Sequence, residues 1–159
     1  TFGIAIGGSL GSNKDEMKDI VHFTSSKLDN SRPVHLLGIG DPRDIWDFVA
    51  DGIDTFDCVS PTRIARHGSA LVKGKQGKIN LKNVKYKNNL NPIDNECNCY
   101  TCKNFTLAYL HYLFSTQELL GLQLLTTHNI YFMNNLMKEV RSSIDNNNFD
   151  NAKKKWLNS

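Results

Sequence analysis

The sequence predicts an α/β fold with a parallel sheet in its first third. Three short apolar runs have the composition of buried strands, at residues 3–8, 34–40 and 54–60. Glycines close the first two runs and Pro61 closes the third, as expected where strands end in turns. Residues 15–28 and 42–52 carry apolar side chains at helical spacing. Because strands that alternate with helices in this way pair in parallel, an α/β class follows.

The rest of the chain is expected to be a hairpin followed by helices. Residues 71–81 alternate around a glycine-rich tip, which is a β-hairpin signal. Apolar spacing from residue 105 to about 144 predicts helices, and Gly121 is expected to divide two of them. After a polar break at residues 146–148, Trp156 indicates a last short helix packed by its aromatic side chain.

Composition limits the classes of protein. The chain has 159 residues, of which 40% are hydrophobic and 22% charged, so a wholly disordered protein is excluded. No apolar stretch reaches the ~18 residues of a membrane span, and residues 1–10 lack the basic start of a signal peptide. We therefore expect a cytoplasmic protein with no membrane partner. The net charge of +3 permits a nucleic-acid partner without requiring one.

Three of the four cysteines fall within six residues, at Cys97, Cys99 and Cys102. Such a thiolate cluster indicates a metal site rather than a disulfide framework, and a closed tetrahedral zinc site needs one more ligand. His128 is the preferred fourth ligand and His111 is the alternative. Three thiolates and a histidine leave no position for water, so the predicted zinc ion is structural, one per chain. Cys58, on another segment, is expected to be a buried strand residue.

Asp57 lies near the end of the third predicted strand, where barrels of parallel strands keep their chemistry. Strand alternation puts Asp54 and Asp57 on opposite faces, so a regular strand cannot bring both to one site. The alternative for Asp57 is a structural ion pair with Arg63 or Arg66. A basic run at residues 63–75 follows, and it indicates either a solvated surface or a phosphate-contacting face.

Four motifs occur in order along the chain: Gly7-Gly8, Leu37-Gly38-Ile39-Gly40-Asp41-Pro42, the run at residues 52–68, and Cys97-x-Cys99-x-x-Cys102 with His128-Asn129. Together they resemble the tRNA-guanine transglycosylases, also called queuine tRNA-ribosyltransferases, over essentially the whole chain. The resemblance implies the C-terminal portion of a TIM (β/α) barrel with an inserted zinc-binding subdomain. It also implies an enzyme that exchanges the wobble guanine of tRNA for a 7-deazaguanine base.

The resemblance implies three segments and an incomplete barrel. Residues 1–68 would hold the last three β/α units, residues 69–128 the hairpin and zinc-binding subdomain, and residues 129–159 the C-terminal helices. A TIM barrel typically needs ~250 residues. We therefore expect a C-terminal fragment that binds zinc but is inactive alone, because the family's general acid/base lies in the missing part.

The same resemblance assigns roles to residues. Asp57 matches the nucleophile that forms a covalent ester with the ribose. The segment expected to bind the base is Gly7, Gly8, Ser9, Leu10 and Gly11. The residues expected to contact RNA are Gly38, Ile39, Gly40, Asp41, Pro42, Arg43 and Asp44, with Thr62, Arg63, Ile64, Ala65 and Arg66. The implied partners are tRNA with a GUN anticodon, guanine or a 7-deazaguanine base, and a second subunit in a homodimer or a family heterodimer.

Two alternatives accompany this assignment. A non-catalytic accessory subunit would keep the zinc module and lose the nucleophile, so the intact Asp57 favours the catalytic enzyme. A stand-alone zinc-stapled interaction module does not fit the three strand–helix units. When the glycine turn is aligned from Gly8, Gly11 takes the position of a valine and Asn13 that of a glutamate in bacterial members. The freed volume favours queuine, unless the one-residue gap in this turn falls elsewhere.

Overall fold

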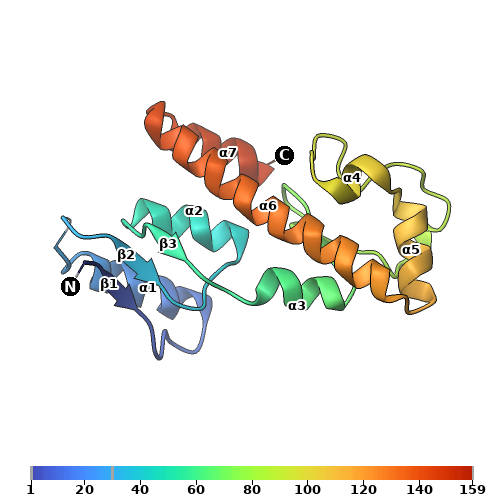
Figure 1. Ribbon diagram of the computed structural model, residues 1–159. Helices are drawn as coiled ribbons and strands as arrows, with labels where there is room; N and C mark the ends of the chain where they lie inside the picture. Colours follow the sequence, from blue (N-terminus) through green and yellow to red (C-terminus); the bar gives the residue numbers. More distant parts are fainter. Residues whose placement is uncertain (1, 30, 159) are drawn as a thin grey trace. The chain divides into compact units, whose positions relative to one another are not determined.

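The computed structural model describes residues 2–29 and 31–158, and the chain forms two compact units (Figure 1). The first unit, Thr1–Ser60, is of mixed α/β type. Its elements are β1 (Ile4–Ile6), α1 (Lys14–Ser25), β2 (Val34–Leu36), α2 (Pro42–Ala50) and β3 (Thr55–Phe56).

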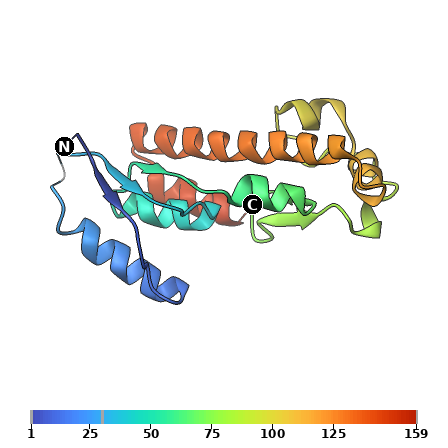
Figure 2. The same cartoon turned by 60° about the horizontal axis from the view of Figure 1, so that its bottom comes forward.

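The second unit, Pro61–Ser159, is mainly helical and contains a two-stranded antiparallel hairpin. Its elements are α3 (Ser60–Arg66), which starts one residue earlier, β4 (Ser69–Leu71), β5 (Lys78–Asn80), the 3-10 turn η1 (Val84–Tyr86), α4 (Tyr100–Asn104), α5 (Leu107–Ser115), α6 (Leu119–Asp145) and α7 (Phe149–Asn158). Figure 2 shows α6 as one continuous helix running along this unit. The predicted hairpin and last helix are therefore confirmed, with Trp156 buried in α7.

The sheet of the first unit is parallel, in the order β1-β2-β3. One row across the sheet, Ile6, Leu36 and Phe56, packs with residues of α1 and α2 in a single apolar cluster. The two helices lie side by side, joined by the ion pair of Lys18 Nζ with Asp47 Oδ2 at 2.7 Å. The connections from β1 to β2 and from β2 to β3 each run through a helix to the neighbouring parallel strand. Because such crossovers are right-handed, α1 and α2 cover the same face of the sheet.

The opposite face of the sheet carries the row formed by Ala5, His35 and Thr55. Ala5 and Thr55 are exposed and His35 is partly exposed, so this face is not covered by the helices of the unit. Strand alternation carries the same face on to Asp57, two residues beyond Thr55. His35 and Asp57 therefore lie on the face of the sheet that α1 and α2 do not cover.

Gly121 does not divide two helices, contrary to the sequence prediction. It lies in the first turn of α6 and is buried, and a Cβ added there would lie 3.1 Å from Leu113 Cβ of α5. The break falls just before it, at Gln117, whose φ of 58° is left-handed and ends α5. The missing side chain thus serves the close packing of α5 on α6.

The strands are shorter than their apolar runs. β2 ends at Leu36, and β3 covers only Thr55–Phe56. Pro61 lies in the first turn of α3 rather than closing a strand, which suits a residue without an amide hydrogen. Cys58 is accordingly half-buried in the connection between β3 and α3, not in a buried strand. Among the residues described, no helix has both the length and the apolar character needed to cross a membrane.

Neighbouring leucines on β2 and in the turn after it give a test of the first unit. Leu36 is fully buried between sheet and helices, whereas Leu37 is 46% exposed. Leu36→Ala should lower the free energy of unfolding by about 2–5 kcal/mol, because it leaves a cavity in the core. Leu37→Ala, the matched control, should cost less than about 1 kcal/mol. Urea denaturation measures both, and equal losses would contradict this packing.

Candidate metal centre and strand-end carboxylate

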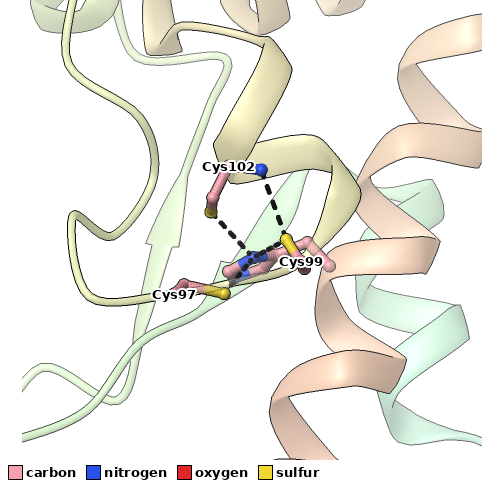
Figure 3. A group of neighbouring side chains, drawn as sticks. Cys97, Cys99 and Cys102 are labelled. Carbon is pink, nitrogen blue, oxygen red and sulfur yellow. Dashed lines mark hydrogen bonds between the residues drawn. The ribbon is translucent and has the colours of Figure 1, made fainter.

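Three cysteines and one histidine meet in the second unit (Figure 3). Cys97 and Cys99 precede α4, Cys102 lies in α4, and His128 lies in α6. The four donor atoms lie within 4.8 Å of one another, and Nδ1 of His128 is 3.9, 3.5 and 3.4 Å from the three sulfurs in chain order. A tetrahedral ion with bonds of about 2.0–2.3 Å keeps its ligand atoms about 3.5–3.8 Å apart. The cluster therefore fits a metal ion.

The orientation of His128 is set by the hairpin. Its Nε2 lies 2.9 Å from the carbonyl oxygen of Leu71 in β4, and the residue is fully buried. A carbonyl only accepts, so Nε2 carries a hydrogen and Nδ1 is the atom turned toward the sulfurs. A second-sphere carbonyl of this kind is the usual partner of a metal-bound histidine.

Protonation in the cluster is strongly perturbed. Burial alone would lower the pKa of His128, but hydrogen bonds to the sulfurs of Cys97 and Cys99 outweigh it and raise the pKa to about 9. Hydrogen bonds from Cys102 and Cys97 lower the pKa of Cys99, whereas hydrogen bonds with Cys97 and Cys99 raise the pKa of Cys102. The protons of these buried thiols and of the imidazole are therefore coupled. A metal ion binds such a site by displacing protons from its ligands.

Asn129, next to the candidate ligand His128, joins two segments to α6, the strand β4 and the start of α3. Its Oδ1 accepts a hydrogen bond from Leu71 N at 2.9 Å, and its Nδ2 donates to Pro61 O at 2.9 Å and Ser69 O at 3.0 Å. Thr101 adds a link from α4 by donating to Leu124 O at 2.6 Å. The metal cluster therefore sits within a preformed polar framework.

His111 is not part of the cluster, so the alternative fourth ligand is wrong. Its Nδ1 lies 2.7 Å from Leu81 O, which attaches α5 to the end of the hairpin. The structure thus brings together the three cysteines and His128, the set preferred from the sequence.

Asp57 follows β3 in the first unit, and its side chain is 60% exposed. Oδ1 lies 3.1 Å from Gly38 N, which donates to it, and 3.1 Å from Nε2 of His35. The Gly38 amide first, and His35 second, hold the pKa of Asp57 below its ordinary value. The carboxylate is therefore ionised at neutral pH and bonded to His35.

Asp54 has a structural role, as strand alternation predicts. Its Oδ2 accepts a hydrogen bond from Val34 N at 2.7 Å and so joins the start of β2 to the chain entering β3. Only Asp57 of the two carboxylates is available at the strand ends.

The glycine turn differs from the sequence expectation. Gly7, Gly8 and Ser9 are exposed after β1, while Leu10 packs against the core. Gly11 has a φ of 88°, and a Cβ there would lie 2.6 Å from Glu16 Cβ. Asn13 caps α1, because its side chain accepts hydrogen bonds from the backbone amides of Asp15 and Glu16. A valine at position 11 would therefore be strained and would press against Glu16.

The carboxylates expected to contact RNA after β2 are engaged within the protein. Asp41 caps α2 by accepting from Arg43 N at 3.0 Å. Asp44 is buried, and its Oδ2 is 3.0 Å from Lys14 Nζ of α1. Lys14 Nζ also lies 3.2 Å from Asp41 Oδ2, so both carboxylates bond α2 to α1, a link that the sequence did not indicate.

The second segment expected to contact RNA lies mostly on α3. Arg63 and Arg66 are exposed, whereas Ala65 is fully buried in the core. Lys73, farther along the basic run, is paired with Glu139 Oε1 at 2.7 Å. The two arginines are therefore the side chains of this segment best placed for a phosphate.

Comparison with known proteins identifies this α/β chain with a Cys3His centre as one of a family of transferases. The model of the family "Queuine tRNA-ribosyltransferase" matches residues 1–159, so the chain belongs to that family.

Curated relatives carry the same name. A "Queuine tRNA-ribosyltransferase" of Roseiflexus sp. (strain RS-1) is 46% identical over 157 residues, and one of Francisella tularensis subsp. tularensis (strain WY96-3418) is 44% identical over 156 residues. Each alignment covers 98% of this chain but only 39% and 42% of the respective relative. A third, from Dehalococcoides mccartyi (strain ATCC BAA-2266 / KCTC 15142 / 195), is 44% identical over 156 residues, covering 98% of this chain and 39% of the relative. The chain therefore spans about two fifths of the length of these relatives.

The metal centre can be tested by substitution of one cysteine. Cys99→Ser should reduce the bound metal from about one ion per chain to a small fraction, since it removes a buried thiolate ligand. Cys58→Ser, outside the cluster, should leave the metal content unchanged. Elemental analysis of the purified chain measures both, and full metal content in Cys99→Ser would contradict the ligand assignment.

Proposed function

We propose that this chain carries the nucleophile and the structural zinc site of a tRNA-guanine transglycosylase. The reaction is exchange of the wobble guanine in tRNA for a 7-deazaguanine base. The observation that carries the proposal is the ionised carboxylate of Asp57 at the end of a parallel strand, in a chain of the queuine tRNA-ribosyltransferase family.

A (β/α) barrel is the architecture that best accommodates the first unit. The strands follow one another in sheet order and both helices cover one face, whereas a doubly wound sheet reverses its order and uses both faces. The row Ala5, His35 and Thr55 would then face the interior of the barrel. The loops after β1, β2 and β3 would lie at the carboxyl end of the barrel, where such enzymes place their active sites.

The exchange proceeds by two displacements at the ribose. An oxygen of Asp57 attacks C1′, the bond from C1′ to guanine N9 breaks, and guanine leaves with a proton from a general acid. The incoming base returns its N9 proton to that group and attacks C1′, and the ester bond to Asp57 breaks. Two inversions retain the configuration, as in retaining glycosidases. The proton-transfer group belongs to the part of the enzyme that this chain does not span.

Zinc is the metal that the three thiolates and one imidazole suit best. An ion held by Cys97, Cys99, Cys102 and His128 would have no open position, so it would take no part in the displacements. Its contribution is to cross-link α4 and the preceding loop to α6.

A second subunit would dock on the aromatic surface of α4 and α5. The Tyr100 and Phe105 ring centroids are 5.8 Å apart, and those of Phe105 and Tyr109 are 5.4 Å apart. Tyr100 is 61% exposed and Tyr109 is 39% exposed. Exposed clustered aromatics of this kind are typical of interfaces, which supports a homodimer or a family heterodimer.

Asp57→Asn in the complete enzyme should abolish the covalent RNA–protein adduct, because an amide oxygen is a far weaker nucleophile than a carboxylate. Asp54→Asn is the matched control and should keep the adduct, since its amide oxygen can still accept from Val34 N. Denaturing gels of enzyme incubated with tRNA measure both. Metal content should be unchanged, and an adduct that survives in Asp57→Asn would refute the assignment.

Arg66→Ala should weaken tRNA binding and reduce the slope of log K against log salt by about one, the loss of one phosphate contact. Lys103→Ala, a substitution of an exposed lysine on α4, should leave the slope unchanged. Binding titrations at several salt concentrations measure both slopes, and an unchanged slope in Arg66→Ala would exclude a phosphate contact there.

A further inference from the structure

His35 lies on β2 beside Asp57, and no step of the exchange described above uses it. We infer that His35 is a positioning residue: with the Gly38 amide it holds Oδ1 of Asp57, reserves Oδ2 for attack on the ribose, and promotes breakdown of the covalent intermediate. This inference rests on the proposed function of Asp57.

The imidazole is held at both nitrogens. His35 and Thr55 are opposite each other in the parallel register of β2 and β3, and Nδ1 lies 2.8 Å from Thr55 Oγ1. Nε2 faces the ionised carboxylate of Asp57, which only accepts, so Nε2 carries a hydrogen. A neutral ring then accepts at Nδ1 from the threonine hydroxyl, and a charged ring donates to the same hydroxyl. The ring orientation is therefore kept in both protonation states.

Both donors act on one oxygen of the carboxylate. Gly38 N and His35 Nε2 each lie 3.1 Å from Oδ1. In the part of the chain that the structure describes, Oδ2 accepts no hydrogen bond, and the side chain is 60% exposed. Oδ2 is therefore the atom that can reach an incoming C1′.

The two donors act differently on the two displacements. During attack, Oδ2 forms the bond to C1′ and Oδ1 becomes the carbonyl oxygen of the ester, so the donors stabilise the starting carboxylate and give no help. During breakdown, the bond from C1′ to Oδ2 breaks and its electron pair returns to the carboxylate. Part of that charge appears on Oδ1, where donors are already in place, as preorganised donors stabilise a developing oxyanion.

The test separates the two half-reactions in the complete enzyme. His35→Phe removes the donor, and His35→Gln keeps an amide N–H that can reach the carboxylate. Rapid quenching with labelled tRNA gives the rate of adduct formation without free base, and addition of guanine gives the rate of adduct breakdown. In His35→Phe we expect breakdown to slow roughly tenfold to hundredfold, formation to change by less than about threefold, and adduct to accumulate.

His35→Gln should recover most of the breakdown rate, and Thr55→Val, which frees Nδ1, should show a weaker form of the same defect. A parallel loss of both rates in His35→Phe would mean a merely structural role and would overturn the inference, as would unchanged rates. If the wild-type enzyme forms an adduct that Asp57→Asn lacks, the proposed function stands whatever the His35 variants show. If wild-type enzyme forms none, both proposals fail.

Discussion

The buried pair His128 and Asn129 on α6 is the interaction on which the second unit depends. Through these two adjacent side chains, α6 is bonded to the hairpin, to the start of α3 and to the thiolate loop. Both side chains are buried and hydrogen-bonded. Removing one partner would leave the other buried without a hydrogen bond, which costs a large desolvation free energy. The four candidate metal ligands thus lie at one end of this hydrogen-bonded network.

The sequence predicted those parts of the site that are local in the chain. Three cysteines within six residues carry their own signal, because the loop that holds them is short. The sequence favoured His128 over His111 but gave no geometric reason, since both lie on helices downstream. The two histidines differ in the carbonyl oxygen that each one contacts. His128 bonds to Leu71 O beside the cysteines, whereas His111 bonds to Leu81 O at the far end of the hairpin.

Features that depend on contacts between distant segments were missed. His35 had no local signal, because its contact with Asp57 follows from the register of two strands twenty residues apart. Asp44, expected to contact RNA, is buried and paired with Lys14. The parallel sheet itself was predicted, but its strands were drawn too long, because apolar residues such as Ile39 continue into the turn and pack there against the core.

Half of the clamp on Asp57 is main chain, and this limits what genetics can reveal about it. The donor at position 38 is a peptide N–H, which every amino acid except proline would supply. Gly38 also has a φ of 76°, so most replacements would distort the turn and appear in a mutational scan as folding defects. The contribution of this amide to reactivity is accessible only to backbone chemistry, for instance an ester bond in place of the peptide bond between residues 37 and 38.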